Sequence, residues 1–226
     1  MIAIPLAGES SRFFNNGYKD FKFFLPLNKL TVIENIISWI PKNEQILFIV
    51  LEKHNIKDRL INLFLNSTKK IHVVSIKTSS GQLDSVEKGV RKALKKSYIS
   101  LDDSLIVFNG DTIRKKIFRF NDYGDWWLET FVGEGTHWSF ADKLGVVSKI
   151  TEKIRISNNC SNGLYSLSIV KVFLNLISDY QVKNDEKYVA PFLNYVLSKG
   201  YTVRAFNIKK ELLDFCGTPK GLLIYL

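Results

Sequence analysis

The sequence has very few of the residues that cross-links and zinc sites require. Only two of its 226 residues are cysteine, Cys160 and Cys216, and neither lies in a CxxC pair. The three histidines, His54, His72 and His137, are equally scattered. Such a set cannot form a disulfide framework or a four-ligand zinc site. We therefore expect both cysteines to stay reduced, as in a cytoplasmic protein.

Long apolar runs are also absent. The longest uninterrupted run of hydrophobic residues, 46–51, has six members, whereas a membrane-spanning helix needs about 20. The opening residues, MIAIPLAGES, lack the basic stretch that begins a secretory signal. The sequence thus predicts neither a membrane partner nor secretion.

Positive charge is in excess. Lys and Arg number 32 against 22 Asp and Glu, which gives a formal net charge of +10. This excess suits a phosphorylated or nucleic-acid ligand, although it could also serve solubility alone. Because the lysines are spread along the chain without an arginine-rich stripe, we expect no nucleic-acid partner. A hydrophobic fraction of 46% excludes a disordered chain.

The length and the apolar pattern predict one α/β domain over residues 1–226. Short apolar runs typical of strands alternate with stretches of helical periodicity in the first half, and the second half is richer in strands. This order predicts a mixed, mostly parallel central sheet with helices on both faces. The predicted strands cover residues 1–6, 45–51, 71–76, 104–108, 126–132, 138–141, 145–150, 163–167 and 201–208, and the predicted helices cover residues 31–39, 57–65, 85–95, 168–179 and 188–199.

Three loops carry the residue types of a phosphate site. Small residues and Arg12 follow the first strand, where backbone N–H groups and a guanidinium can contact phosphates. Lys22 lies in an aromatic segment, and Asp111 follows a buried strand after a glycine, a suitable place for a Mg²⁺ ligand. Each feature also has a plain structural explanation: a tight turn with a surface arginine, a lysine whose end reaches solvent, and a turn aspartate.

Taken in order, these segments resemble a known family. Residues 7–13 (AGESSRF), 21–27 (FKFFLPL), 109–111 (NGD), 145–153 (GVVSKITEK), 161–165 (SNGLY) and 217–219 (GTP) are similar to motifs of the sugar-phosphate nucleotidyltransferases. These are the glucose-1-phosphate thymidylyltransferases and their shorter relatives in capsule and surface-polysaccharide pathways. The resemblance spans nearly the whole chain. It implies a Rossmann-like, GT-A-like fold with a nucleotide-binding half at about 1–115 and an acceptor-binding half at about 116–226.

The resemblance also implies roles for particular residues. Arg12 and Lys22 would contact the nucleotide phosphates, and Asp111 would bind a Mg²⁺ cofactor; these three are the expected catalytic residues. The expected nucleotide-binding residues are Leu6, Ala7, Gly8, Glu9, Ser10, Ser11, Gly81, Gln82, Asn109 and Gly110. The expected acceptor-binding residues are Glu152, Lys153, Asn162 and Gly163.

Two departures from the family pattern bear on this site. Ser10 replaces a glycine of the phosphate loop, and Phe215 stands where an acidic residue is usual, which leaves a second metal ligand in doubt. Trp126, Trp127 and Trp138 fit either a wall of the acceptor pocket or the core.

The implied reaction transfers a nucleoside monophosphate from an NTP to a small phosphorylated acceptor, with CTP or UTP favoured over the other nucleotides. A GT-A-type glycosyltransferase is an alternative, but Asp111 is not part of the Asp-x-Asp pair usual there. A non-catalytic nucleotide-binding homologue is the second alternative. The sequence leaves open whether the chain forms a homo-oligomer.

Overall fold

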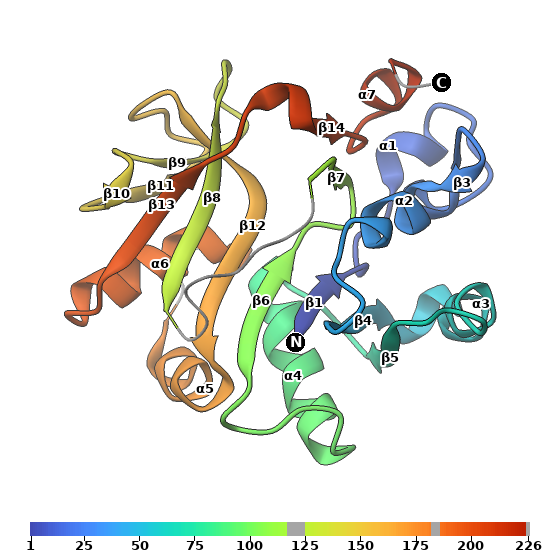
Figure 1. Ribbon diagram of the computed structural model, residues 1–226, viewed down its shortest axis with the longest axis horizontal. Helices are drawn as coiled ribbons and strands as arrows, with labels where there is room; N and C mark the ends of the chain where they lie inside the picture. The colour runs from blue at the N-terminus through green and yellow to red at the C-terminus, as the bar shows by residue number, and fades with distance from the viewer. Residues whose placement is uncertain (117–124, 182–185, 225–226) are drawn as a thin grey trace.

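A ten-stranded mixed sheet forms the centre of the computed structural model (Figure 1), which describes residues 1–116, 125–181 and 186–224. The main path of the sheet runs β10-β13-β8-β12-β6-β1-β4-β5, and β9 and β11 pair beside it. Strands β6, β1, β4 and β5 are parallel, whereas β12 is antiparallel to both β6 and β8. The β12–β6 pair therefore joins the two halves of the chain in one sheet.

The elements have the following bounds. The strands are β1 (Ile2–Pro5), β2 (Pro26–Leu27), β3 (Leu30–Thr31), β4 (Gln45–Leu51), β5 (Lys70–Ile76), β6 (Ser104–Phe108), β7 (Thr112–Arg114), β8 (Trp126–Val132), β9 (Ser139–Ala141), β10 (Gly145–Val146), β11 (Ile150–Glu152), β12 (Asn159–Ile169), β13 (Val203–Asn207) and β14 (Leu213–Phe215). The α-helices are α1 (Ser11–Phe14), α2 (Val32–Ser38), α3 (Lys57–Leu63), α4 (Gln82–Lys95), α5 (Val170–Asp179), α6 (Val189–Ser198) and α7 (Pro219–Leu223), and the 3₁₀ turns are η1 (Lys22–Phe24), η2 (Glu52–His54) and η3 (Lys210–Leu212).

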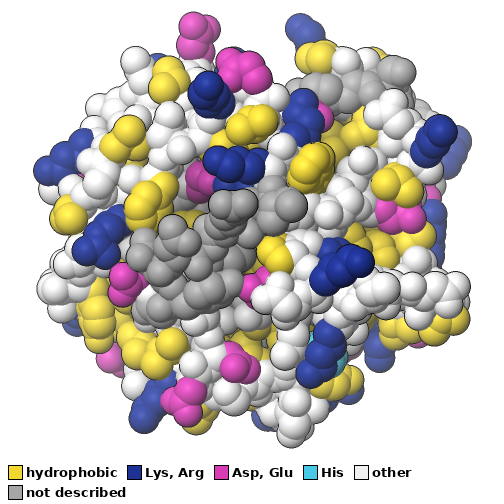
Figure 2. All heavy atoms as spheres, viewed as in Figure 1, with side chains coloured by type: hydrophobic (Ala, Val, Ile, Leu, Met, Phe, Trp, Pro, Cys, Tyr) yellow, Lys and Arg dark blue, Asp and Glu magenta, His cyan; other side chains and the backbone are white. Residues whose placement is uncertain are grey.

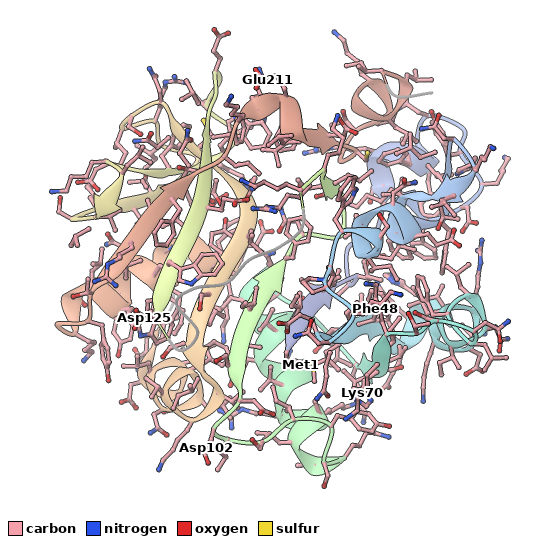
Figure 3. All side chains as sticks on the ribbon, viewed as in Figure 1. Met1, Phe48, Lys70, Asp102, Asp125 and Glu211 are labelled. Carbon is pink, nitrogen blue, oxygen red and sulfur yellow. The ribbon has the colours of Figure 1, made fainter. Side chains whose placement is uncertain are left out.

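Helices cover both faces of the sheet because successive side chains of a strand point to opposite faces. In β4, Leu47 and Ile49 pack into a core with α4, α5 and α6. Between them Phe48, labelled in Figure 3, is fully buried in a second core with α1, α2 and α3. Since both faces of β4 are buried, this strand is apolar from Ile46 to Leu51. The predicted fold class is confirmed.

Most of the predicted elements are present. Strands β4, β6 and β8 have the predicted bounds, and α2 begins after Thr31, which forms a capping box with Glu34. The prediction of one strand over residues 145–150 is wrong: β10 pairs with β13, whereas β11 pairs with β9. Gly145 has a φ of 76°, and Asp142, which precedes β10, accepts the backbone N–H of Ser148, which lies between β10 and β11.

The three tryptophans divide between the two roles considered for them. Trp126 and Trp127 are 3% and 6% exposed and pack into the cores on opposite faces of the sheet. Trp138 instead borders the large cavity described below. In the part of the chain that the structure describes, no helix has both the length and the apolar character needed to cross a membrane.

Candidate active site

One large cavity, of about 710 Å³, is lined by residues from both halves of the chain. It lies beyond the carboxyl ends of β1 and β6, the usual ligand position of such sheets. Its volume is in the range of small-molecule sites. Thirteen of the seventeen residues expected at the site line it: Leu6, Ala7, Gly8, Glu9, Arg12, Lys22, Gly81, Gln82, Asn109, Gly110, Asp111, Glu152 and Gly163.

The phosphate loop carries two of the four residues that do not line the cavity. Ser10 has a φ of 52°, in the left-handed region, and immediately precedes α1, which begins at Ser11. The Ser10 Oγ accepts the backbone N–H of Lys22 at 3.3 Å. A left-handed backbone favours glycine, which the resemblance implies at this position, and the serine hydroxyl adds a hydrogen bond. Ser10 therefore joins the Arg12 loop to the Lys22 segment.

Lys22 and Asp111, far apart in the sequence, form an ion pair inside the cavity. The Lys22 Nζ lies 2.5 Å from the Asp111 Oδ2, and both side chains are about three-quarters buried. Lys22 is the first residue of η1, where the buried rings of Phe23 and Phe24 fix the backbone.

Cys216 lies close to this ion pair. Burial, and then the nearby carboxylates, raise the pKa of its thiol to about 12, so Cys216 is not a thiolate nucleophile.

A metal at this site would have one protein carboxylate. Phe215 lines the cavity and pairs with Thr112 across the β14–β7 ladder. Because strand side chains alternate, the preceding Asp214 points away and pairs with Lys115 at 2.8 Å. Among residues 1–116, 125–181 and 186–224, no group of three His, Cys, Asp or Glu side chains is placed to hold a metal ion. Asp111 together with substrate phosphates still fits Mg²⁺, which commonly uses one carboxylate in this way.

The opposite end of the cavity carries amide and backbone groups. The Gln82 Nε2 donates to the Asn109 Oδ1 at 2.6 Å. The Gln82 carbonyl can accept a hydrogen bond from a bound molecule. Gly81 has a φ of 129°, and a Cβ there would lie 2.6 Å from the Lys187 carbonyl. Only glycine allows the backbone of residue 81 to come this close to the backbone of Lys187, and the start of α4 is therefore packed against residue 187.

The negative Glu9 side chain lies at the rim of the cavity. Its carboxylate pairs with Lys53 at 2.5 Å and with the His54 Nε2 at 3.2 Å. The hydrogen bond from Lys53 is the largest cause that lowers the pKa of Glu9. Neither Lys53 nor His54 was expected here, because both follow β4 rather than the recognisable loop. They hold the phosphate loop to the end of the neighbouring strand.

The second half of the chain contributes a partly buried carboxylate and hydroxyl groups to the cavity. Burial raises the pKa of Glu152, while a hydrogen bond from the Ser139 hydroxyl opposes the shift. Burial also raises the pKa of Tyr165 to about 12, so its phenol stays protonated. This arrangement can accept hydrogen bonds from an acceptor through Glu152 and donate them through Tyr165.

Two expected acceptor residues do not line the cavity. Lys153 has a φ of 56° and donates to the Tyr188 hydroxyl, an interaction that raises the pKa of the lysine. Asn162 is 1% exposed, and its Nδ2 donates to the Glu129 Oε1 at 2.6 Å. The register of β12 against β8 shifts between residues 161 and 165, and such a bulge re-aims side chains.

Sequence reasoning missed most of an aromatic wall. Trp138 and Phe215 both line the cavity, with ring centroids 4.8 Å apart, and Tyr188 lines it as well. Phe131 supports the pair from the core, 5.1 Å from the Trp138 ring. Only Trp138 had been considered. Phe131 comes from β8 of the main sheet, Phe215 from β14 of the separate β7–β14 ladder, and Trp138 from the segment before β9.

Comparison with known proteins identifies the family. No protein-family model matches the sequence, and no curated protein does. The nucleoside-diphosphate-sugar pyrophosphorylase from Vibrio cholerae RC9 is 30% identical, with a TM-score of 0.90 over 100% of this chain and 99% of that one. The inositol-1-phosphate CTP transferase from T. maritima is 16% identical, with a TM-score of 0.77 over 99% of this chain and 92% of that one. The UDP-glucose pyrophosphorylase from Acinetobacter baumanii is also 16% identical, with a TM-score of 0.71 over 99% and 90%.

The fold and the cavity define a protein of the nucleotidyltransferase class. The similarity to the Vibrio cholerae protein is one of sequence as well as of fold, with 30% identity over the full chain. This chain belongs to the sugar-phosphate nucleotidyltransferase family, the nucleoside-diphosphate-sugar pyrophosphorylases.

Proposed function

We propose that the chain transfers a nucleoside monophosphate from an NTP to a sugar phosphate or a similar small phosphorylated acceptor, releasing pyrophosphate. The observation that supports this most is the convergence of Arg12, Lys22 and Asp111 on one cavity. A phosphate oxygen of the acceptor attacks the α-phosphorus, and the bond from that phosphorus to the bridging oxygen breaks. Pyrophosphate leaves with the electron pair, so the reaction needs no protein nucleophile.

The cations and backbone of the site supply positioning and charge neutralisation. Backbone N–H groups of the loop around Gly8 contact the phosphates, and Arg12 stabilises the leaving pyrophosphate. Lys22 neutralises the charge that grows at the α-phosphate in the transition state. The family resemblance assigns the acceptor phosphate to Lys153, which in the structure donates to the hydroxyl of Tyr188, a residue of the cavity wall.

Mg²⁺ is the cofactor that this proposal implies. Asp111, together with phosphate oxygens, would hold it, and the ion would supply positive charge against the triphosphate when bound. In the structure Lys22 is paired with the Asp111 carboxylate. If Asp111 held the cation instead, the Lys22 ammonium group would be available to the α-phosphate.

CTP or UTP is the donor that we favour. The Gln82 carbonyl can accept a hydrogen bond from the cytosine amino group or from uracil N3, so it is compatible with either base. Because the other bases also carry donors, the NTP panel described below decides the choice. The acceptor meets the Glu152 carboxylate and the aromatic wall. The proposal extends to a cytoplasmic enzyme that makes precursors for capsule or surface polysaccharide.

A pyrophosphate-release assay with each NTP and a panel of phosphorylated sugars and polyols tests the proposed function. We expect release to require both substrates and to be strongest with CTP or UTP. Glycosyl transfer from an NDP-sugar without pyrophosphate release would instead support the glycosyltransferase alternative. Binding of nucleotide without turnover across the panel would support the non-catalytic alternative.

A further inference from the structure

Behind the cavity lies a buried charged network that the proposed mechanism does not use. Arg114 of β7 and Glu129 of β8 form a bidentate ion pair, in which both N–O distances are 2.8 Å. Their residues are 7% and 8% exposed. Asn162 of β12 adds a third hydrogen bond to the Glu129 carboxylate. Burying a charged pair is costly and often no better for stability than an apolar pair, so a role beyond stability is worth seeking.

One end of the network reaches the Asp111 segment directly. Arg114 lies on β7, three residues after Asp111, and its strand pairs with β14, which carries Phe215 into the cavity. Glu129 therefore holds, through Arg114, the strand that follows the metal-binding candidate.

The other end reaches the same loop from the opposite side. The Asn162 Oδ1 accepts the backbone N–H of Leu164 at 3.1 Å, which fixes the turn at Gly163. The Gly163 carbonyl accepts the backbone N–H of Asn109 at 3.1 Å. Gly163 has a φ of 87°, and a Cβ there would lie 2.1 Å from the Asn109 amide. The two segments are thus in close contact.

From Asn109 the contacts continue to the end of the cavity where we place the base. The Asn109 Oδ1 accepts from Gln82. The loop 109–111 is consequently held at Asn109 by β12 and beyond Asp111 by β7, and both attachments meet at the Glu129 carboxylate.

We propose that Glu129 and Asn162 are positioning residues that fix the 109–111 loop, and through it Asp111 and Gln82, for phosphoryl transfer. The catalytic part of this inference rests on the proposed function. Asn162 thus serves the site from behind rather than by touching the acceptor. Because Asp111 acts on the reacting phosphates, its misplacement should lower turnover more than nucleotide affinity.

Asn162→Ala is the primary test, because it removes two hydrogen bonds and no charge. We expect its kcat to be at least tenfold below that of the native protein while its dissociation constant for the nucleotide changes by less than threefold. We also expect faster amide hydrogen exchange over residues 109–111. Glu129→Gln, which keeps the size of the side chain, should change kcat in the same direction.

Asp125→Asn is the matched control. Asp125, labelled in Figure 3, precedes β8 and forms an exposed ion pair with Arg204 of β13 at 3.3 Å. Asp125→Asn should leave both kcat and the amide hydrogen exchange of residues 109–111 unchanged. The inference is overturned if the kcat of Asn162→Ala stays within twofold of this control, or if kcat and nucleotide affinity fall together in proportion to a lowered Tm.

The exchange measurement separates the inference from the proposed function. If the native protein releases no pyrophosphate with any substrate pair, the proposed function fails. Loop positioning is then judged by exchange alone: faster exchange at residues 109–111 in Asn162→Ala supports it, and unchanged exchange refutes it.

Discussion

Lys22→Ala separates a catalytic role of the Lys22–Asp111 pair from a structural one. The two side chains are 23% and 25% exposed, so solvent partly screens their attraction. A partly exposed ion pair of this kind contributes about 0–1 kcal/mol to stability. We therefore expect Lys22→Ala to fold, with only a small loss of unfolding free energy.

The effect on turnover should be much larger. A cation that meets charge developing in the transition state contributes at least about 2–3 kcal/mol. This corresponds to a loss of roughly 30- to 150-fold in kcat. Steady-state pyrophosphate release gives kcat, and urea unfolding followed by tryptophan fluorescence gives the unfolding free energy.

Lys115→Ala is the matched control for this experiment. Lys115 pairs with Asp214 at 2.8 Å on the neighbouring β7–β14 ladder, and neither residue lines the cavity. It should cost a similar small amount of stability and leave kcat unchanged. A kcat for Lys22→Ala within about threefold of this control would refute the assignment of Lys22.

Further substitutions test other parts of the structure. Ser10→Gly should leave the Tm almost unchanged, because relief of the left-handed φ of 52° offsets loss of the bond to the Lys22 N–H; a large loss would show that the hydroxyl dominates. Gly163→Ala should lower the Tm far more than Gly145→Ala, since both have a positive φ but a Cβ meets Asn109 only at residue 163; equal losses in thermal unfolding would contradict the contact. Glu152→Gln should be more stable than the native protein at neutral pH. Burial raises the folded pKa of Glu152 above its ordinary 4.5, so its folded state favours the protonated acid and loses stability as pH rises. The Tm difference should therefore vanish below about pH 4.5, and a pH-independent difference would exclude this origin.

The sequence was most informative where burial alone decides structure. Strands β4 and β6 are apolar after their first residue, β8 is apolar apart from Glu129 and Thr130, and the predicted bounds of all three are the observed ones. The β7–β14 ladder was not predicted, because three-residue strands carry no periodic signal and form through pairing across a hundred residues. Yet this ladder places Phe215 in the cavity and turns Asp214 out of it.

The site shows the same division. Motif residues that follow parallel strands gather because the carboxyl ends of those strands share one edge of the sheet, and this brings Arg12, Lys22 and Asp111 together. Asn162 could not be placed in this way, because the irregularity in β12 that turns it toward Glu129 depends on three-dimensional pairing. The roles carried over for Lys153 and Asn162 remain predictions that their observed contacts do not support.

The excess of positive charge is spread over the surface rather than gathered in one patch on the face that Figure 2 shows. Figure 2 shows Lys and Arg side chains spread over this face of the molecule among apolar and acidic groups. Several cations of the described chain are committed to carboxylates, as Lys53 is to Glu9 and Lys22 to Asp111. Among the described residues, the Lys and Arg side chains that line the cavity are Arg12 and Lys22, and Lys22 is paired with Asp111.

Nucleotide binding by the native protein tests the central claim most directly. Thermal unfolding would be followed with ATP, GTP, CTP, UTP and dTTP, each with Mg²⁺. A ligand at 100 times its dissociation constant adds about 2.7 kcal/mol to stability, which is a clear rise in Tm. We predict such a rise with CTP or UTP. No rise with any of the five nucleotides would contradict the assignment of this cavity to a nucleotide.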